Sequence, residues 1–309
     1  MNRNAEPSKK RTISMAGKKE KIWPEVMCII GPSGCGKGTL VKHLRKVLGI
    51  KHHVETGELF RCHIGDEQAG IDPTAVGKLS ESFVDAGAWV PDEITNLVIL
   101  DDIRTRLGQK GLPLDRLSGL IGMEPKEAIP HMQQMLEVGL NDLKFDASQG
   151  WVFDTLRTDG QVEFLARITG VDLVLDMHAA DDQVIAQIKG RAEEAQAKGE
   201  KVRSDDLDPK AIKKRLLSFY DKIEGVRAAF DRLFPGRRED FIVPNGADVM
   251  KERGVETVKG ARRKRIEIIK AHEQRRKEKP AKVVDDAEII PLKGSYVRNG
   301  IIIDAANGK

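Results

Sequence analysis

The segment with the clearest chemistry is rich in glycine and carries one lysine. Residues 31–39 read GPSGCGKGT, with Lys37 between two glycines. Glycine lets a backbone curl until several N–H groups converge on one point, where bulkier residues would clash. A lysine beside that point adds a mobile cation that can follow phosphate oxygens. The segment indicates a nucleotide phosphate site, with the expected residues Gly31, Ser33, Gly34, Cys35, Gly36, Lys37, Gly38 and Thr39.

The residues on either side place this loop between a strand and a helix. Residues 26–30 form a short apolar run that ends at Gly31, which is typical of a buried strand followed by a turn. The spacing Gly31-x4-Gly36-Lys37 fits a P-loop, although Gly38 stands where the general pattern has Ser or Thr. The following helix would direct the positive end of its dipole at the phosphates. Its apolar face is predicted from Leu40, Val41, Leu44, Val47 and Leu48.

Strands and helices alternate through much of the remaining chain. Expected strands cover 151–153, 171–175 and 241–243, and expected helices begin near Gly160, after Asp181 and at Pro209. Such alternation predicts βαβ units and a parallel sheet covered by helices on both faces. We therefore expect a three-layer α/β fold, the P-loop NTPase fold.

Further segments follow the loop in a recognisable order. They are TGELFR at 56–61, DAGAWVPD at 85–92, DTLRTDGQ at 154–161, Gly190-Arg191, RSDD at 203–206 and Arg215-Leu216. Together with the GKGT form of the loop, they resemble the adenylate kinase family of nucleoside monophosphate kinases over roughly residues 25–250. The resemblance implies transfer of a phosphoryl group from ATP to a nucleoside monophosphate. It also implies a small helical acceptor-binding region and a short lid.

The resemblance also implies which residues contact the acceptor. The threonine of the TGELFR segment would touch the acceptor base, the backbone near Val90 would lie along it, and Gln161 would read an adenine through its amide. Arg61 and Arg157 would hold the acceptor phosphate, because a guanidinium is permanently charged and binds phosphate oxygens in a fork. The expected acceptor-binding residues are Thr56, Gly57, Arg61, Val90, Arg157 and Gln161.

Other charged residues would act on the donor and on the transferring group. By the resemblance, Arg191, Arg203 and Arg215 close over ATP. Asp205 and Asp206 would hold the lid closed by pairing with arginines or loop amides. An aspartate at the carboxyl end of the 151–153 strand would orient waters around a Mg²⁺ that the ATP phosphates hold. Mg²⁺ is thus the expected cofactor, bound through water by Asp154, and the expected catalytic residues are Lys37, Asp154, Arg157, Arg203 and Arg215.

Three departures from the family pattern leave alternatives open. The DTLR segment at 154–157 is one residue shorter than the family's D-G-F-P-R, and Gln187 stands where an arginine is usual, so Lys189 would have to supply that contact. Only eleven residues separate Arg191 from Arg203, which resembles the short lid, slightly extended. AMP is the leading acceptor. The alternatives are CMP, UMP or another nucleoside monophosphate, or a catalytically weak nucleotide-sensing module with basic ends that bind nucleic acid or a protein.

Charge is distributed unevenly along the 309 residues. The net charge of +4 combines +5 in residues 1–22, −7 in 23–255, +7 in 256–282 and −1 in 283–309. This pattern indicates a folded domain with appended basic segments. The expected parts are a disordered arm at 1–22, a kinase-like domain at 23–255, a basic helix at 256–282 and a tail at 283–309. Within the domain we expect the acceptor-binding region at 56–92, a helical insert at 108–147 and the lid at 188–206.

Some of these parts carry no readable chemistry. The insert has Met132, Met135, Leu136 and Leu140 at helical spacing, a pattern typical of core packing. The tail has Asn299-Gly300 between β-forming residues, which predicts a hairpin. The basic helix has no interleaved aromatic residues. It would contact the phosphates of a nucleic acid, or an acidic partner, or simply be a solvated helix.

Composition limits the remaining possibilities. No apolar run reaches the ~18 residues that a membrane span needs, and the N-terminal residues have no apolar core of a secretory signal. We expect no membrane association, a cytoplasmic location and a monomer. The three cysteines, Cys28, Cys35 and Cys62, are expected to be free thiols. Cys35 lies near a helix N-terminus, which can lower the pKa of a thiol, but a small residue tolerated in the loop is favoured over a redox switch.

Overall fold

The computed structural model describes residues 23–65, 70–85, 90–154, 156–199, 202, 204–278, 295–298 and 301–304. It divides the chain into two compact units, Met1–Arg262 and Arg263–Lys309. The predicted arm at 1–22 lies outside the described residues. No helix in the described part of the chain is both long enough and apolar enough to span a membrane.

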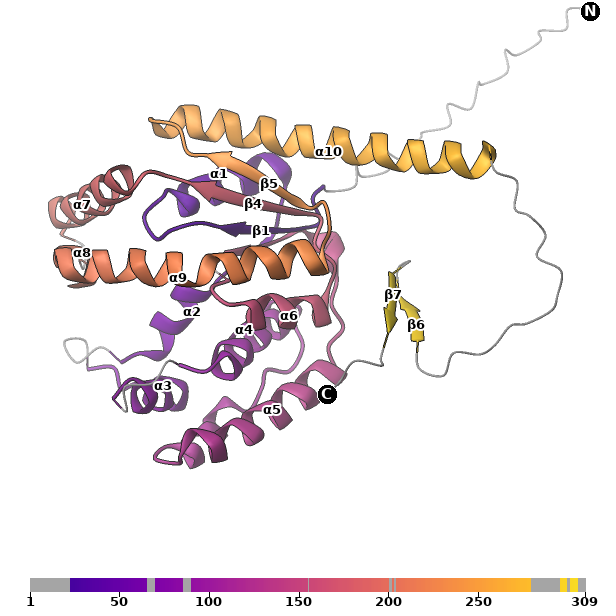
Figure 1. The fold of residues 1–309 in the computed structure, drawn as a ribbon. Coiled ribbons are helices and arrows are strands. Elements are labelled where there is room, and N and C mark those ends of the chain that lie inside the picture. The colour runs from indigo at the N-terminus through magenta and orange to yellow at the C-terminus, as the bar shows by residue number, and fades with distance from the viewer. Residues whose placement is uncertain are drawn as a thin grey trace, which may run out of the picture. The chain divides into compact units, whose positions relative to one another are not determined.

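The first unit is built on a parallel sheet. Among the described residues, five strands pair in the order β2-β3-β1-β4-β5, and every pair is parallel. Parallel strands need crossover connections, and the intervening helices provide them (Figure 1). This arrangement confirms the predicted three-layer α/β fold. The strands are β1 (Val26–Ile30), β2 (His52–Glu55), β3 (Trp151–Asp154), β4 (Leu173–His178) and β5 (Arg238–Ile242).

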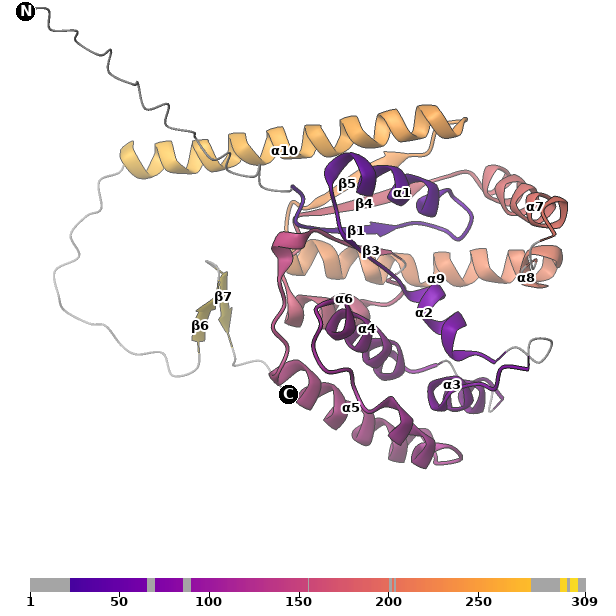
Figure 2. The same cartoon turned by 180° about the vertical axis from the view of Figure 1, so that it is seen from behind.

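Side chains of alternating residues in the central strand enter two separate cores. Val26, Cys28 and Ile30 pack into one core, whereas Met27 and Ile29 pack into the other. All five are at most 1% exposed, as expected for a strand covered on both faces. Helices therefore lie on both sides of the sheet, as the two opposite views show (Figures 1 and 2).

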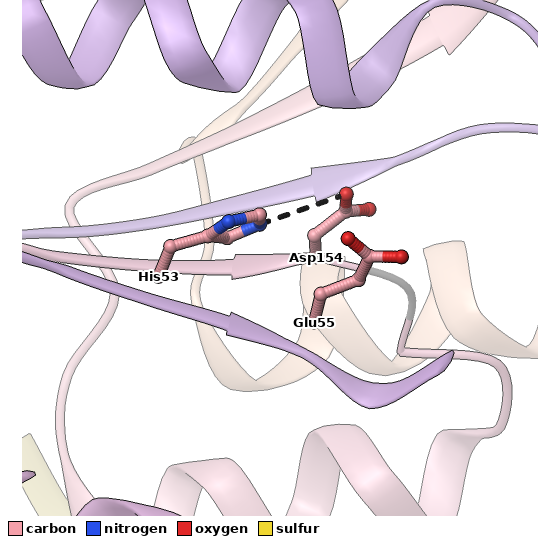
Figure 3. A group of neighbouring side chains, drawn as sticks. All are labelled: His53, Glu55 and Asp154. Carbon is pink, nitrogen blue, oxygen red and sulfur yellow. Dashed lines mark ion pairs between the residues drawn. The ribbon is translucent and has the colours of Figure 1, made fainter. Parts of the chain in front are cut away.

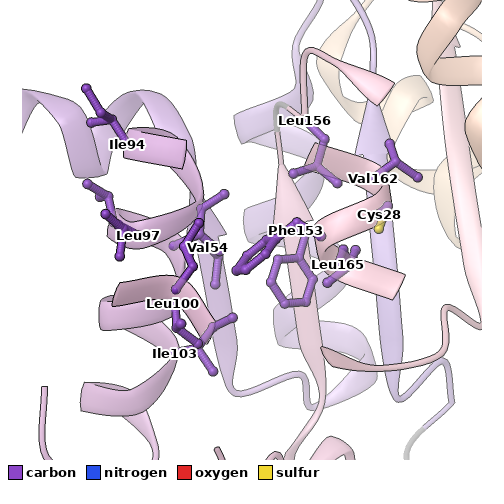
Figure 4. Close-up of a cluster of buried hydrophobic side chains, with 14 of the residues drawn as sticks. Cys28, Val54, Ile94, Leu97, Leu100, Ile103, Phe153, Leu156, Val162 and Leu165 are labelled. Atoms are coloured by element: carbon purple, nitrogen blue, oxygen red, sulfur yellow. The ribbon is translucent and has the colours of Figure 1, made fainter. Parts of the chain in front are cut away.

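The core that contains Cys28 is the larger one. It joins β1, β2 and β3 to α4 and α6 through side chains such as Val54, Phe153, Leu97 and Leu165 (Figure 4). It also extends into the predicted insert. The helices involved are α3 (Ala75–Asp85), α4 (Asp92–Arg106), η2 (Leu114–Leu120), α5 (Pro125–Asn141), α6 (Asp159–Ile168) and α9 (Pro209–Leu233).

The second core covers the other face of the sheet. Leu40, Val41 and Leu44 of the first helix are fully buried there, together with Met250 and Val258. Val47, which the sequence places on the same face, is 50% exposed instead. It lies in the last turn of the helix. The helices are α1 (Lys37–Leu48), α7 (Asp181–Ala197), the start of α9 and the first part of α10 (Ala247–Glu278).

The carboxyl ends of the parallel strands meet at one edge. Glu55 at the end of β2 is in register with Asp154 at the end of β3, and Ile30 at the end of β1 is in register with Asp176 of β4. The loop at 31–36 follows β1, and α2 (Thr56–His63) follows β2. Segments distant in the sequence are thereby placed around one location.

The remaining elements are short or lie beyond the first unit. The predicted lid region contains the end of α7 and α8 (Ser204–Leu207), and η3 (Ala147–Gln149) precedes β3. In the tail, β6 (Ser295–Arg298) and β7 (Ile301–Asp304) pair antiparallel. The Asn299-Gly300 pair between them lies outside the described residues.

Candidate active site

The loop between β1 and α1 is held in a conformation that needs glycine. Gly34 and Gly36 have φ angles of 93° and 92°, in a region that other residues rarely adopt. A Cβ atom on Gly34 would also lie 2.5 Å from Cγ1 of Ile188 on α7. Gly38 differs, because it lies in the first turn of α1 with open space around it. Gly38 therefore adopts no backbone conformation that needs glycine, and the expectation that it helps the loop to curl is wrong.

Lys37 turns back along this loop. Its Nζ donates hydrogen bonds to the carbonyl oxygens of Gly31 and Pro32, each at 2.9 Å, and the residue is only 8% exposed. Both acceptors are neutral carbonyls. A phosphate would offer the ammonium group a charged acceptor and a stronger hydrogen bond. These two hydrogen bonds hold the ammonium group of Lys37 at the loop.

The loop opens onto a cavity of about 970 Å³. Four of the described arginines line it: Arg61 on α2, Arg157 after β3, Arg191 on α7 and Arg215 on α9. Because basic side chains outnumber acidic ones in this lining, the cavity attracts ligands of negative charge. Phosphate groups are the ligands that this lining suits best.

Two acidic residues lie at the floor of the same cavity. Asp154 ends β3 and is 3% exposed, and Glu55 on the neighbouring strand also lines the space. Arg61 Nη2 donates to Glu55 Oε1 at 3.2 Å, so one arginine of the lining contacts this acidic pair. The cavity therefore combines cationic walls with a carboxylate floor, an arrangement suited to phosphate and a divalent cation together.

No protein-family model matches the chain. An adenylate kinase of Bartonella bacilliformis is 30% identical over 200 residues, which are 63% of this chain and 80% of that protein. An adenylate kinase of Renibacterium salmoninarum is 28% identical over 207 residues, which are 67% of this chain and 83% of that protein.

The chain belongs to the adenylate kinase family.

A third adenylate kinase, from Pseudarthrobacter chlorophenolicus, is 27% identical over 241 residues, or 76% of this chain and 97% of its own length. Among solved structures, a gluconokinase from Sinorhizobium meliloti is similar at 10% sequence identity. The match covers 78% of this chain and 96% of the gluconokinase chain. Its TM-score of 0.40 is too low to carry an argument. The sequence relatives thus agree with the resemblance in the motifs, and the chain is a P-loop kinase of the adenylate kinase type.

Most of the residues expected to bind ATP in this family member line the cavity. Cys35 does not line it. Its side chain is fully buried in the core between the loop and α1, and burial raises the pKa of its thiol. The structure therefore corrects the suggestion that the helix N-terminus lowers that pKa. The expected residues that do line the cavity are Gly31, Ser33, Gly34, Gly36, Lys37, Gly38, Thr39 and Arg191.

The predicted lid has an ion-pair centre at Asp206. Its carboxylate accepts from Arg191 Nε and Nη2 at 2.9 and 2.6 Å, and from Arg215 Nη2 at 2.9 Å. Asp206 is 3% exposed, so the pairing with arginines that the sequence predicts is present and shielded. Arg203 and the side chain of Asp205 lie outside the described residues.

The residues expected to read the acceptor base are not at the cavity. Gln161 is 5% exposed; its amide donates to Asp92 Oδ1 at 2.9 Å and accepts from the backbone N–H of Arg157 at 2.8 Å. Thr56 is also buried, and its hydroxyl donates to the backbone carbonyl of Asp154. In this structure Gln161 serves to fix the backbone at Arg157 rather than to face a base. Val90 is partly buried against the larger core.

The structure adds residues that the sequence reasoning missed. His53 and Glu55 alternate along β2 and lie beside Asp154. The alternation of His53 and Glu55 directly before Thr56-Gly57 could have indicated a strand. Two histidines and a glutamate within four residues, however, are not typical of a buried strand. Gln187 lines the cavity, whereas Lys189 is exposed and does not, so the structure gives no support to Lys189 as a substitute.

Proposed function

We propose that this chain transfers the γ-phosphoryl group of ATP to AMP and so forms two molecules of ADP. The observation that carries the proposal is the single cavity into which the P-loop lysine and arginines from four separate segments converge. Such convergence serves a reaction in which charge is spread over several phosphate oxygens. The adenylate kinase relatives support AMP as the acceptor.

In this proposal the protein positions two nucleotides and stabilises the charge of the moving group. The loop backbone, Lys37 and the N-terminus of α1 hold the donor phosphates. Arg61 and Arg157 hold the acceptor phosphate at the opposite side of the cavity. Arg191 and Arg215, fixed by Asp206, lie where the lid meets the donor. In-line transfer then needs no covalent intermediate on the protein, because orientation and electrostatics supply the rate enhancement.

The floor of the cavity fits a magnesium ion that arrives with ATP. Asp154 offers a buried carboxylate at the carboxyl end of β3, next to Glu55, and carboxylate oxygens are ligands that Mg²⁺ accepts directly or through water. We propose that Asp154 orients the water ligands of this ion. The ion would neutralise charge on the phosphates when bound.

The acceptor base is proposed from the relatives rather than from side chains at the cavity. Thr56 and Gln161 are buried and occupied by protein partners, so neither side chain faces the cavity. An acceptor such as CMP or UMP would use the same phosphate-binding arginines. The base preference therefore has to be measured.

The test is turnover with ATP and Mg²⁺ in the presence of AMP, CMP, UMP or a deoxynucleotide, each in turn. We expect kcat/KM to be highest with AMP, and we expect Arg157→Ala to reduce it by on the order of 10²-fold, the effect of removing one charge-stabilising donor. Arg167→Ala is the matched control, because Arg167 lies on α6, is exposed and pairs with Glu137 away from the cavity.

Each outcome has a distinct meaning. A higher kcat/KM with CMP or UMP would keep the mechanism and replace the acceptor. No turnover with any acceptor, in a folded chain that binds ATP, would overturn the kinase proposal. It would favour the nucleotide-sensing alternative.

A further inference from the structure

Three potential metal ligands lie close together on β2 and β3, and two of them, Glu55 and Asp154, line the cavity. His53 and Glu55 lie on the same face of β2, two residues apart, and Asp154 on β3 is the register partner of Glu55. One ligand atom from each of the three residues lies within 4.8 Å of the others. Figure 3 shows the imidazole and the two carboxylates directed toward a shared location.

The imidazole in this group has an unmet bonding requirement. Nε2 of His53 is buried and has no hydrogen-bond partner among the described residues. It lies 3.8 Å from Asp154 Oδ2, which is too long for a hydrogen bond. Buried polar atoms are nearly always bonded, so an unpartnered nitrogen directed at two carboxylates points to a missing ligand between them.

The distances suit one ion bound by all three groups. Two ligand atoms that each lie about 2.1 Å from one metal ion are separated by roughly 3 to 3.5 Å. The observed 3.8 Å between His53 Nε2 and Asp154 Oδ2 needs only a small rotation of either side chain to reach that range. The side chains are 12% and 3% exposed, so the protein holds both near this position.

A second cluster of the same residue types shows the contrast. Asp176, His178 and Asp240 also lie close together. The carboxylate of Asp176, however, already accepts hydrogen bonds from Arg227 and Arg238. Those two arginines contact the fully buried Asp176. At the first cluster Arg61 contacts the partly exposed Glu55, and His53 Nε2 is the atom that has no hydrogen-bond partner among the described residues.

We propose that His53, Glu55 and Asp154 bind one first-row transition-metal ion directly, of the class of Mn²⁺ or Co²⁺. One nitrogen and two carboxylate oxygens favour such ions, whereas Mg²⁺ prefers oxygen ligands alone. Glu55 and Asp154 line the cavity, so the remaining coordination positions of the ion face the phosphate site. The site goes beyond the proposed function, because that function assigns no ligand role to His53 or Glu55 and no direct metal bond to Asp154.

The test uses the full-length chain and Mn²⁺ without nucleotide. A titration followed by the electron paramagnetic resonance of free Mn²⁺ should show saturable binding of one ion per chain. Pulsed measurements on the bound ion should show coupling to a ¹⁴N nucleus. His53→Gln should remove that coupling and weaken Mn²⁺ binding by about tenfold or more. It should also reduce the preference for Mn²⁺ over Mg²⁺ in competition.

Two further variants make the result decisive. Glu55→Gln, in a side chain that is 26% exposed, should also weaken Mn²⁺ binding and is easier for the fold to tolerate. His131→Gln is the control, because His131 is exposed on α5 and does not line the cavity, and its Mn²⁺ affinity should equal that of the wild type. Thermal unfolding of each variant verifies that it is folded.

Either of two results would overturn the proposal. One is the absence of saturable Mn²⁺ binding to the wild-type chain. The other is equal Mn²⁺ affinity, or persistent ¹⁴N coupling, in a folded His53→Gln variant. Because no nucleotide is present, neither result bears on phosphoryl transfer to AMP, and the two proposals can fail separately.

Discussion

Lys37 and Asp154 place opposite charges in a largely buried setting at one cavity. They are 8% and 3% exposed, and burying a charge costs free energy unless partners compensate it. Two loop carbonyls compensate Lys37 in part. A phosphate group would offer Lys37 a charged acceptor, and its divalent cation would offset the charge of Asp154. The pair therefore suits a ligand that brings both charges into the cavity.

The three cysteines should differ in reactivity. Burial raises the pKa of the Cys28 and Cys35 thiols, and the thiolate is the reactive form, whereas Cys62 is exposed. We predict that an aromatic disulfide reagent labels a single thiol rapidly in the native chain, and that Cys62→Ser removes this fast phase. Rapid labelling of a second thiol would mean that the loop around Cys35 opens readily.

The phosphate-binding half of the site was more predictable than the base-binding half. Glycines and Lys37 are contiguous, so their spacing alone indicates where backbone and ammonium group converge. Gln161 was different. Its partner Asp92 is distant in sequence, and only the packing of α6 against α4 shows that the amide is occupied. Arg157, which the motif order assigns to the acceptor phosphate, lines the cavity, but spacing cannot reveal which polar groups a fold pairs internally.

At the scale of elements, the apolar strand could be predicted with its bounds, whereas strands with polar residues were missed or displaced. The apolar run of β1 was predicted with its observed bounds. β2 was missed because it is an edge strand with two histidines and a glutamate. β4 was predicted at 171–175 but runs from Leu173 to His178. Its last residues include the charged Asp176, which is fully buried and is compensated by two arginines.

The last strand shows a similar displacement. It was predicted at 241–243, whereas β5 covers Arg238–Ile242 and begins with three charged residues. Arg238 pairs with Asp176, Asp231 and Asp240, so ion pairs rather than apolar burial position the start of this strand. Such pairs depend on the assembled fold and leave no local pattern.

The insert contributes to stability through α5. Met132 is fully buried in the larger core, as its helical spacing predicts, whereas Val138 on the same helix is 60% exposed. We predict that Met132→Ala lowers the free energy of unfolding by about 2–5 kcal/mol, the usual cost of truncating a buried side chain. Val138→Ala should change it by less than about 0.5 kcal/mol. Denaturant unfolding of both variants measures the difference, and equal effects would contradict the role of α5 in the core.

At the scale of the whole molecule, charge is separated between the domain and the basic helix. Residues 23–255 carry −7, residues 256–282 carry +7, and α10 runs to Glu278. All residues that line the cavity lie between Gly31 and Met250. The phosphate site and the basic residues can therefore be tested independently.

We predict that a chain ending at residue 262 keeps its turnover, and that any nucleic-acid binding of the full chain is lost with the basic residues. Contacts of basic side chains with phosphates weaken as salt rises, so RNA binding through the basic helix would fall steeply with salt concentration. Filter binding at several salt concentrations compares the two chains. Equal RNA binding by the two chains would show that the domain, and not the basic helix, binds RNA. No RNA binding by the full chain would indicate that the basic helix is only a solvated helix.

The most direct test of the central claim is ADP formation from ATP and AMP by the wild-type chain and by Lys37→Ala. Lys46→Ala is the matched control, because Lys46 is exposed on the same helix and does not line the cavity. The proposed phosphoryl transfer predicts ADP formation that falls on the order of 10²–10³-fold in Lys37→Ala and is unchanged in Lys46→Ala. ADP formation that survives in a folded Lys37→Ala variant, or none in the wild type, would contradict the claim.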